Sequence, residues 1–195
     1  MTASRLLTCG LALFGCVSAG CVSPADHFYT LNTTLNTTSP ARSAPAPAIQ
    51  VRLQVTIPSM VDRNEMVLEN GENGILILDH ERWAAPLSDQ VSQTLARDME
   101  KTRSDILVGD RGFDRTAAPP VTVKVDIVRM SARRGGRANI EAHWRIVDPT
   151  AGVDELGSGS FETAISGDDY AAIARAYSGT LGDLAMRLAQ ELRRP

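Results

Sequence analysis

Cys21 is the residue with the most distinctive chemistry in this sequence. A short apolar run over residues 11–17 precedes it, the small residues Ala19 and Gly20 follow that run, and a polar stretch begins directly after the cysteine. The run is too short to cross a bilayer as a helix, which needs about 20 apolar residues. Small residues before a cysteine admit a signal peptidase, and the thiol can then take a lipid. We expect residues 1–20 to be a cleaved lipoprotein signal peptide and Cys21 to carry a membrane anchor.

Two alternatives to this anchor are open. The residue three positions before Cys21 is Ser18, where lipoprotein signals usually have leucine, whereas cleavage before Cys16 would place Leu13 there, beside the bulky Phe14. Secretion without a lipid is the second alternative. If the lipid is present, two or more acyl chains hold the protein on a membrane, because each buried methylene contributes about 0.8 kcal/mol.

The sequence lacks the patterns that are typical of enzymes and metal sites. His27, His80 and His143 have no partner at ligand spacing such as i, i+4. There is no Gly-x-Ser-x-Gly elbow, phosphate-binding glycine loop or dinucleotide fingerprint. Asp168 and Asp169 could form a carboxylate pair for acid–base chemistry, but acidic residues at a helix N-terminus are commoner. We expect no enzyme activity, no metal and no cofactor.

Arginines form the one local concentration of positive charge. Arg133, Arg134 and Arg137 surround a pair of glycines, a pattern that is typical of a hairpin turn with its charges in water. Guanidinium groups also offer fork-shaped donors that suit lipid phosphates or an acidic partner. These three residues are therefore candidates for a partner or lipid contact as well as for a plain turn.

Three aromatic residues are further candidates for such contacts. Phe28 and Tyr29 lie just beyond the predicted anchor, and Trp83 precedes the first predicted helix. Trp144 falls on the inward side of an alternating strand, so core packing is its expected role.

Composition excludes other classes of function. The formal net charge is −3 at pH 7 and the charges are dispersed, whereas nucleic-acid binding relies on clustered Lys and Arg. Cys9 and Cys16 lie in the predicted signal peptide, so no disulfide is expected and the mature domain depends on its hydrophobic core.

Hydrophobic periodicity predicts a single α+β domain over residues 49–195. Strands are expected over residues 49–57, 66–68, 75–78, 106–108, 121–127, 140–146 and 161–165. Amphipathic helices are expected from Leu87 to about Arg103 and from Gly167 to Arg194. In the predicted architecture both helices pack on one face of a mostly antiparallel sheet.

Residues 21–48 are expected to be the lipidated cysteine and a flexible tether. The composition is rich in Thr, Asn, Pro and Ala, which buries too little apolar surface to fold alone. A flexible coil of about 27 residues would reach on the order of 30 Å. Phe28, Tyr29 and Leu31 interrupt the polar run: this segment would lie at the membrane interface, dock back onto the domain, or form a first edge strand.

The order of these motifs resembles the ABC-type transport auxiliary lipoproteins of the paraquat-inducible protein C type. The likeness starts at the cysteine and the Phe-Tyr-Thr-Leu of residues 28–31, and it is strongest at residues 82–87, whose Arg-Trp-Ala-Ala-Pro-Leu is similar to the family's Trp-Ala-x-Pro-Leu signature. A strand with Trp144, a strand with Phe161 and the opening of the last helix at residues 167–170 follow in the family's order.

This resemblance implies a non-enzymatic partner of an MCE-domain transport protein, a ring- or tube-forming family whose apolar channel carries lipids between membranes. Phospholipid and a second copy of the chain are further expected partners, because a lipoprotein that serves a ring can form a ring itself. Val22 stands where aspartate would retain a lipoprotein at the inner membrane of enteric-type bacteria, so we expect the periplasmic face of the outer membrane. The alternative functions are a general envelope scaffold, pilotin-like or associated with the cell wall, and a domain that itself carries lipid.

Overall fold

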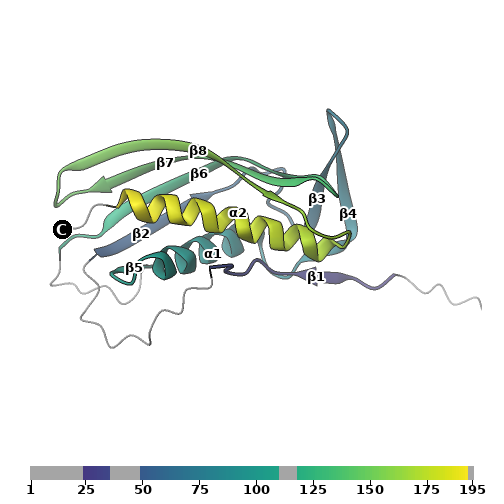
Figure 1. Ribbon diagram of the computed structural model, residues 1–195, viewed down its shortest axis with the longest axis horizontal. Coiled ribbons are helices and arrows are strands. Elements are labelled where there is room, and N and C mark those ends of the chain that lie inside the picture. The colour runs from purple at the N-terminus through teal and green to yellow at the C-terminus, as the bar shows by residue number, and fades with distance from the viewer. Residues whose placement is uncertain (1–23, 36–48, 110–117, 193–195) are drawn as a thin grey trace, which may run out of the picture.

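The computed structural model describes residues 24–35, 49–109 and 118–192, and it confirms a single α+β domain with two helices on one face of a sheet (Figure 1). The elements in chain order are β1 (His27–Tyr29), β2 (Ile49–Thr56), β3 (Glu65–Asn70), β4 (Gly74–Trp83), α1 (Leu87–Thr102), β5 (Ile106–Val108), β6 (Val121–Ala132), β7 (Arg137–Asp148), β8 (Val153–Ala164) and α2 (Tyr170–Glu191).

The larger sheet has five strands in the order β5-β2-β6-β7-β8. β2 runs parallel to β5 and β6, while β6, β7 and β8 form an antiparallel meander. Along β7, alternate residues are buried, namely Ala138, Ile140, Ala142, Trp144 and Ile146. This period-2 pattern gives the sheet one face toward the helices and one polar face toward solvent.

The helices lie side by side on the inner face of this sheet (Figure 1). α2 begins where predicted, because the Asp169 side chain accepts a hydrogen bond from the backbone N–H of Ala172 at 2.8 Å. Small residues let α2 approach the sheet closely: a Cβ added to Gly179 would lie 3.3 Å from the Thr163 side chain. Within the described residues, neither helix has the length and apolar character to cross a membrane.

The remaining strands form a second sheet, where the sequence pattern predicted only one. Its order is β1-β4-β3, with β3 and β4 antiparallel and β1 parallel to β4. The β3–β4 hairpin stands out from the body at one end of the molecule (Figure 1). Two sheets form because β4 continues to Trp83 and pairs there with β1, while the meander is completed by β2 on its other side.

The described part of the predicted tether, residues 24–35, packs against the domain instead of extending from it. β1 pairs with β4 through its three residues, and Leu31 is buried. Of the three roles left open for this segment, the structure shows a first edge strand that is docked on the domain. We call residues 24–35 the strap.

Candidate functional site

The predicted anchor Cys21, like Cys16, lies outside the described residues. The described chain starts at Pro24, three positions after Cys21, and enters β1 at His27. The strap therefore connects the predicted anchor to the folded domain, and its contacts decide how the domain is held.

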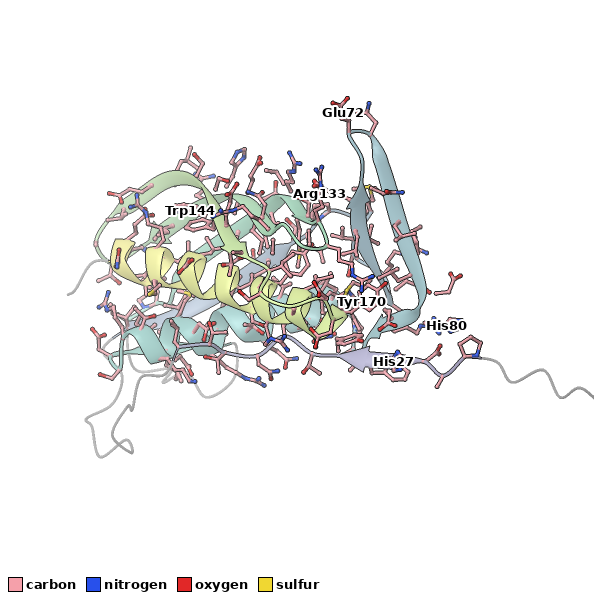
Figure 2. All side chains as sticks on the ribbon, turned by 45° about the vertical axis from the view of Figure 1, so that its right-hand side comes forward. His27, Glu72, His80, Arg133, Trp144 and Tyr170 are labelled. Atoms are coloured by element: carbon pink, nitrogen blue, oxygen red, sulfur yellow. The ribbon has the colours of Figure 1, made fainter. Side chains whose placement is uncertain are left out.

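Two histidine–carboxylate pairs cross the junction of β1 and β4. His27 Nδ1 lies 3.0 Å from Glu81 Oε1, and His80 Nδ1 lies 3.0 Å from Asp26 Oδ1, with both histidines at the same end of the molecule (Figure 2). Arg82 Nη1 lies 3.3 Å from the second oxygen of Asp26. The hydrogen bond from His80, followed by that from Arg82, lowers the pKa of Asp26. The strap thus supplies His27 and Asp26, and β4 supplies Glu81 and His80.

Phe28 and Tyr29, neighbours in β1, have different surroundings. Phe28 is 63% exposed, and it lies at the rim of a shallow groove of about 310 Å³ floored by Ala171 and Ala174 of α2. The Tyr29 hydroxyl donates to Glu81 Oε2 at 2.5 Å. Burial, together with this hydrogen bond to a carboxylate, raises the pKa of Tyr29 to about 12. Phe28 is available for an outside contact, whereas Tyr29 is bound within the domain.

After β1, the strap lies against both helices and is held by polar contacts from each of them. The backbone N–H of Leu31 donates to Gln90 Oε1 at 2.8 Å, and that of Asn32 donates to Ser178 Oγ at 3.1 Å. The Thr33 hydroxyl donates to Asp98 Oδ1, and Lys101 Nζ donates to the carbonyl of Leu35 at 3.2 Å. The strap has no sheet partner beyond β1, so these contacts replace the missing backbone hydrogen bonds and hold residues 31–35 against the helices.

Asp98 is the buried charged residue at the centre of these contacts. Asp98 is 0% exposed. Burial raises the pKa of its carboxyl, while the hydrogen bond from Thr33 and the charge of Lys101 oppose that shift. Its second oxygen, Oδ2, has no hydrogen-bond partner among the described residues. Asp98 lies three residues after Leu95 on the buried face of α1. Its helical spacing from Leu95 could therefore have indicated from the sequence that this carboxyl is buried.

Trp83 is a core residue. It is 4% exposed, and its ring packs against Tyr177 at a centroid distance of 6.4 Å. Its backbone N–H donates to the carbonyl of Asn64 at 2.7 Å. The surface contact that was expected of Trp83 is therefore not available to it in this structure. Trp144, as expected, is also buried.

The three arginines of the β6–β7 turn point to different partners. Arg134 donates twice to the carbonyl of Asp168, at 3.1 and 2.8 Å, and lies over the Tyr170 ring. Arg137 pairs with Glu162 at 2.8 Å, and Arg133 lies 3.8 Å from Glu69. The turn is the predicted hairpin, with Gly135 at φ 66°. Its arginines do not form one common phosphate site.

A groove between the β3–β4 hairpin and β6 was missed by the sequence patterns. This hairpin groove has a volume of about 390 Å³, and its lining includes Met60, Ile75, Val128, Arg129 and Arg133. The three apolar side chains are about half exposed. Ile75 fell in a predicted strand, whereas Val128 lies one position beyond the predicted strand 121–127, at an irregularity in the β6–β7 pairing.

The charges around this groove are paired. Arg129 Nη2 donates to Glu69 Oε1 at 2.8 Å, and that hydrogen bond is the main cause of the lowered pKa of Glu69. In the described ranges, no three His, Cys, Asp or Glu side chains come together as metal ligands would. The arrangement suits binding of a partner with apolar side chains, framed by groups that can exchange ion pairs.

Solved structures share this fold at low sequence identity. One crystal structure of an uncharacterized protein has a TM-score of 0.71 and 17% identity, over 87% of this chain and 100% of the other. A DUF330-family protein from Xanthomonas campestris has a TM-score of 0.61 and 16% identity, over 85% and 92% of the two chains. A PelC dodecamer from Paraburkholderia phytofirmans is a weaker match, with a TM-score of 0.42 and 10% identity over 77% and 92% of the chains. No curated protein sequence matches.

A family model settles the relationship. The model described as "ABC-type transport auxiliary lipoprotein component" matches residues 29–189, which run from the end of β1 almost to the end of α2. The match includes both sheets and the Trp83 segment that suggested the resemblance. The chain belongs to the family of ABC-type transport auxiliary lipoprotein components.

Proposed function

We propose that this protein is a lipid-anchored docking component of an MCE-type lipid transport system at the periplasmic face of the outer membrane. Cys21 carries the anchor, and the domain binds the MCE-domain protein without catalysing a reaction. The observation that carries the proposal is the family match over residues 29–189, since a lipoprotein family implies a place in the cell envelope. Val22 after the cysteine favours the outer membrane.

The hairpin groove is the surface that we assign to the transport partner. It gathers three of the exposed large apolar side chains of the described residues, Met60, Ile75 and Val128. Apolar side chains at the centre of an interface with charged groups at its rim are typical of protein partners. Leu156, which is 82% exposed and lies just after the β7–β8 turn, belongs to a different part of the surface and provides a matched control.

Co-purification in mild detergent tests this function. Tagged full-length protein should recover an MCE-domain protein together with phospholipid, as identified by mass spectrometry. Cys21→Ser should leave the membrane fraction and keep the partner. Ile75→Asp should reduce partner recovery about tenfold or more, while Leu156→Asp should not. A preparation dominated by secretion or cell-wall proteins, with no MCE-domain protein, would instead support a general envelope scaffold.

A further inference from the structure

The docked strap brings the predicted anchor close to one particular edge of the domain. Pro24 is three residues from Cys21, so an extended chain places the two Cα atoms no more than about 11 Å apart. If the whole chain from Cys21 to β2 were a flexible coil, the anchor would instead lie roughly 30 Å from the start of the domain. The inference that follows rests on the proposed lipid at Cys21, and it concerns where the domain lies once that lipid is in a membrane.

The exposed large apolar residue nearest to the anchor along the described chain is Phe28. Side chains of residues 24–28 are all exposed, and Phe28 is the large apolar one among them. It lies seven positions after Cys21, a span of at most about 25 Å. β1 lies at the end of the molecule where the β3–β4 hairpin stands, away from the β7–β8 turn (Figure 1).

The carboxylates around Phe28 have partners within the domain. Asp26 is paired with His80 and Arg82, Arg82 also reaches Glu65 at 3.0 Å, and His27 is paired with Glu81. Each carboxylate here has a basic or imidazole partner. An edge whose carboxylates already have hydrogen-bond partners within the domain can approach a phospholipid surface more readily than one with free carboxylates, while an exposed aromatic ring beside it gains by leaving water.

We infer that the β1 edge of the domain contacts the phospholipid bilayer that holds the anchor, with Phe28 inserted at the boundary of headgroups and acyl chains. The bilayer is favoured over a protein as the occupant because the chain from Cys21 is short enough to keep Phe28 within about 25 Å of the anchor. The strap cannot turn Phe28 away, since hydrogen bonds to Gln90, Ser178 and Asp98 hold the residues that follow it. The hairpin groove is then free for the transport partner.

Site-specific fluorescence tests this contact. Once Cys21 is acylated, a new cysteine is the single free thiol of the mature chain, because Cys9 and Cys16 lie in the predicted signal peptide. Phe28→Cys, Ala25→Cys and Leu156→Cys are labelled with an environment-sensitive dye in the full-length lipoprotein. Each is placed in phosphatidylethanolamine–phosphatidylglycerol vesicles with and without brominated phospholipid. Ala25→Cys retains Phe28, so this variant reports on the edge even if the change at position 28 disturbs β1.

Brominated lipid is expected to quench the labels at positions 28 and 25 about twofold or more, and to leave the label at position 156 unchanged. Equal quenching at all three positions, or none at the two strap positions, overturns the inference. If the strap labels become shielded from water only when an MCE-domain protein is added, and brominated lipid does not quench them, the edge binds a protein and the inference is overturned. Mass spectrometry of the N-terminal peptide separates the two proposals: an unmodified Cys21 removes the anchor and the bilayer contact together, whereas an acylated chain with labels in water removes only the contact.

Discussion

The body of the domain and the junction formed by the strap with the smaller sheet are built in different ways. In the body, α1, α2 and the five-stranded sheet enclose side chains with no exposed surface, among them Val91, Leu95, Leu181 and Leu184. In the junction, Met66, Leu68 and Trp83 of the smaller sheet also reach the core, but paired charges and hydrogen bonds join the outer side of its strands, and large apolar side chains remain in water. The body carries the stability, and the junction carries the surfaces that meet other molecules.

This difference has a physical origin. Apolar burial is non-directional and scales with area, so a continuous core gives most of the folding free energy. Polar pairs at a surface contribute little to stability because water competes for both groups. The surface pairs of the junction therefore add little to the stability of the fold, and its exposed side chains are left to contact other molecules.

The largest expected effect is in the body. Leu184→Ala should lower the free energy of unfolding by about 2–5 kcal/mol, because it removes a fully buried side chain and leaves a cavity. Ile75→Ala in the hairpin should cost less than about 1 kcal/mol, since Ile75 is already 46% exposed. Urea unfolding followed by circular dichroism measures both. Equal losses for the two variants would contradict the division between body and junction.

The second effect should separate the strap from the body. Leu31→Ala removes the main apolar contact of the strap, and a local loss of about 2 kcal/mol would speed amide exchange in the strap roughly 30-fold. Exchange in α2 should change much less. Thr30→Ala, at an exposed neighbouring position, is the matched control. If the amides of α2 accelerate as much as those of the strap, the two regions unfold as one unit and the comparison fails.

Much of the body could be predicted from sequence, because its patterns are local. The alternation along β7 and the cap at Asp169 each depend on residues that are neighbours in the chain. The junction depends on residues far apart, since β1 pairs with β4 across more than fifty positions. Three residues of β1 show too little periodicity to reveal their partner. The strap belongs to a stretch, residues 21–48, with the composition of a linker, although α1 and α2 supply hydrogen bonds to it.

The candidate site shows the same limit. The resemblance led correctly to the family, and Phe28 was selected for its type and its position after Cys21. Trp83 was selected as an aromatic residue before the first predicted helix, but its ring packs against Tyr177 in the core, because a tryptophan before a helix can face either way. The hairpin groove could not be predicted, since it exists only where the two sheets diverge.

A smaller effect concerns the pH dependence at the contact between strap and body. Burial raises the pKa of Asp98 above its ordinary value of 3.8, so the folded protein binds this proton more tightly than the unfolded chain. The resulting stabilisation is complete below the unfolded pKa and is lost as the pH rises through the folded pKa. Asp98→Asn cannot titrate, so its stability relative to wild type should increase between pH 3.8 and neutrality. Urea unfolding across this pH range measures the difference. Asp89→Asn, exposed on the same helix, should not reproduce the trend, and a similar trend there would attribute it to general charge.

The smallest effects distinguish two arginines of one turn. Arg137→Ala removes an exposed ion pair to Glu162 and should cost less than about 0.5 kcal/mol, falling further in high salt. Arg134→Ala removes two hydrogen bonds to the Asp168 carbonyl and the contact with Tyr170, which together support the start of α2, so about 1 kcal/mol is expected. Urea unfolding of both variants in low and high salt tests this order. If Arg137 proved to be the more important residue, the sheet surface would stabilise the domain more than the attachment of the turn to α2.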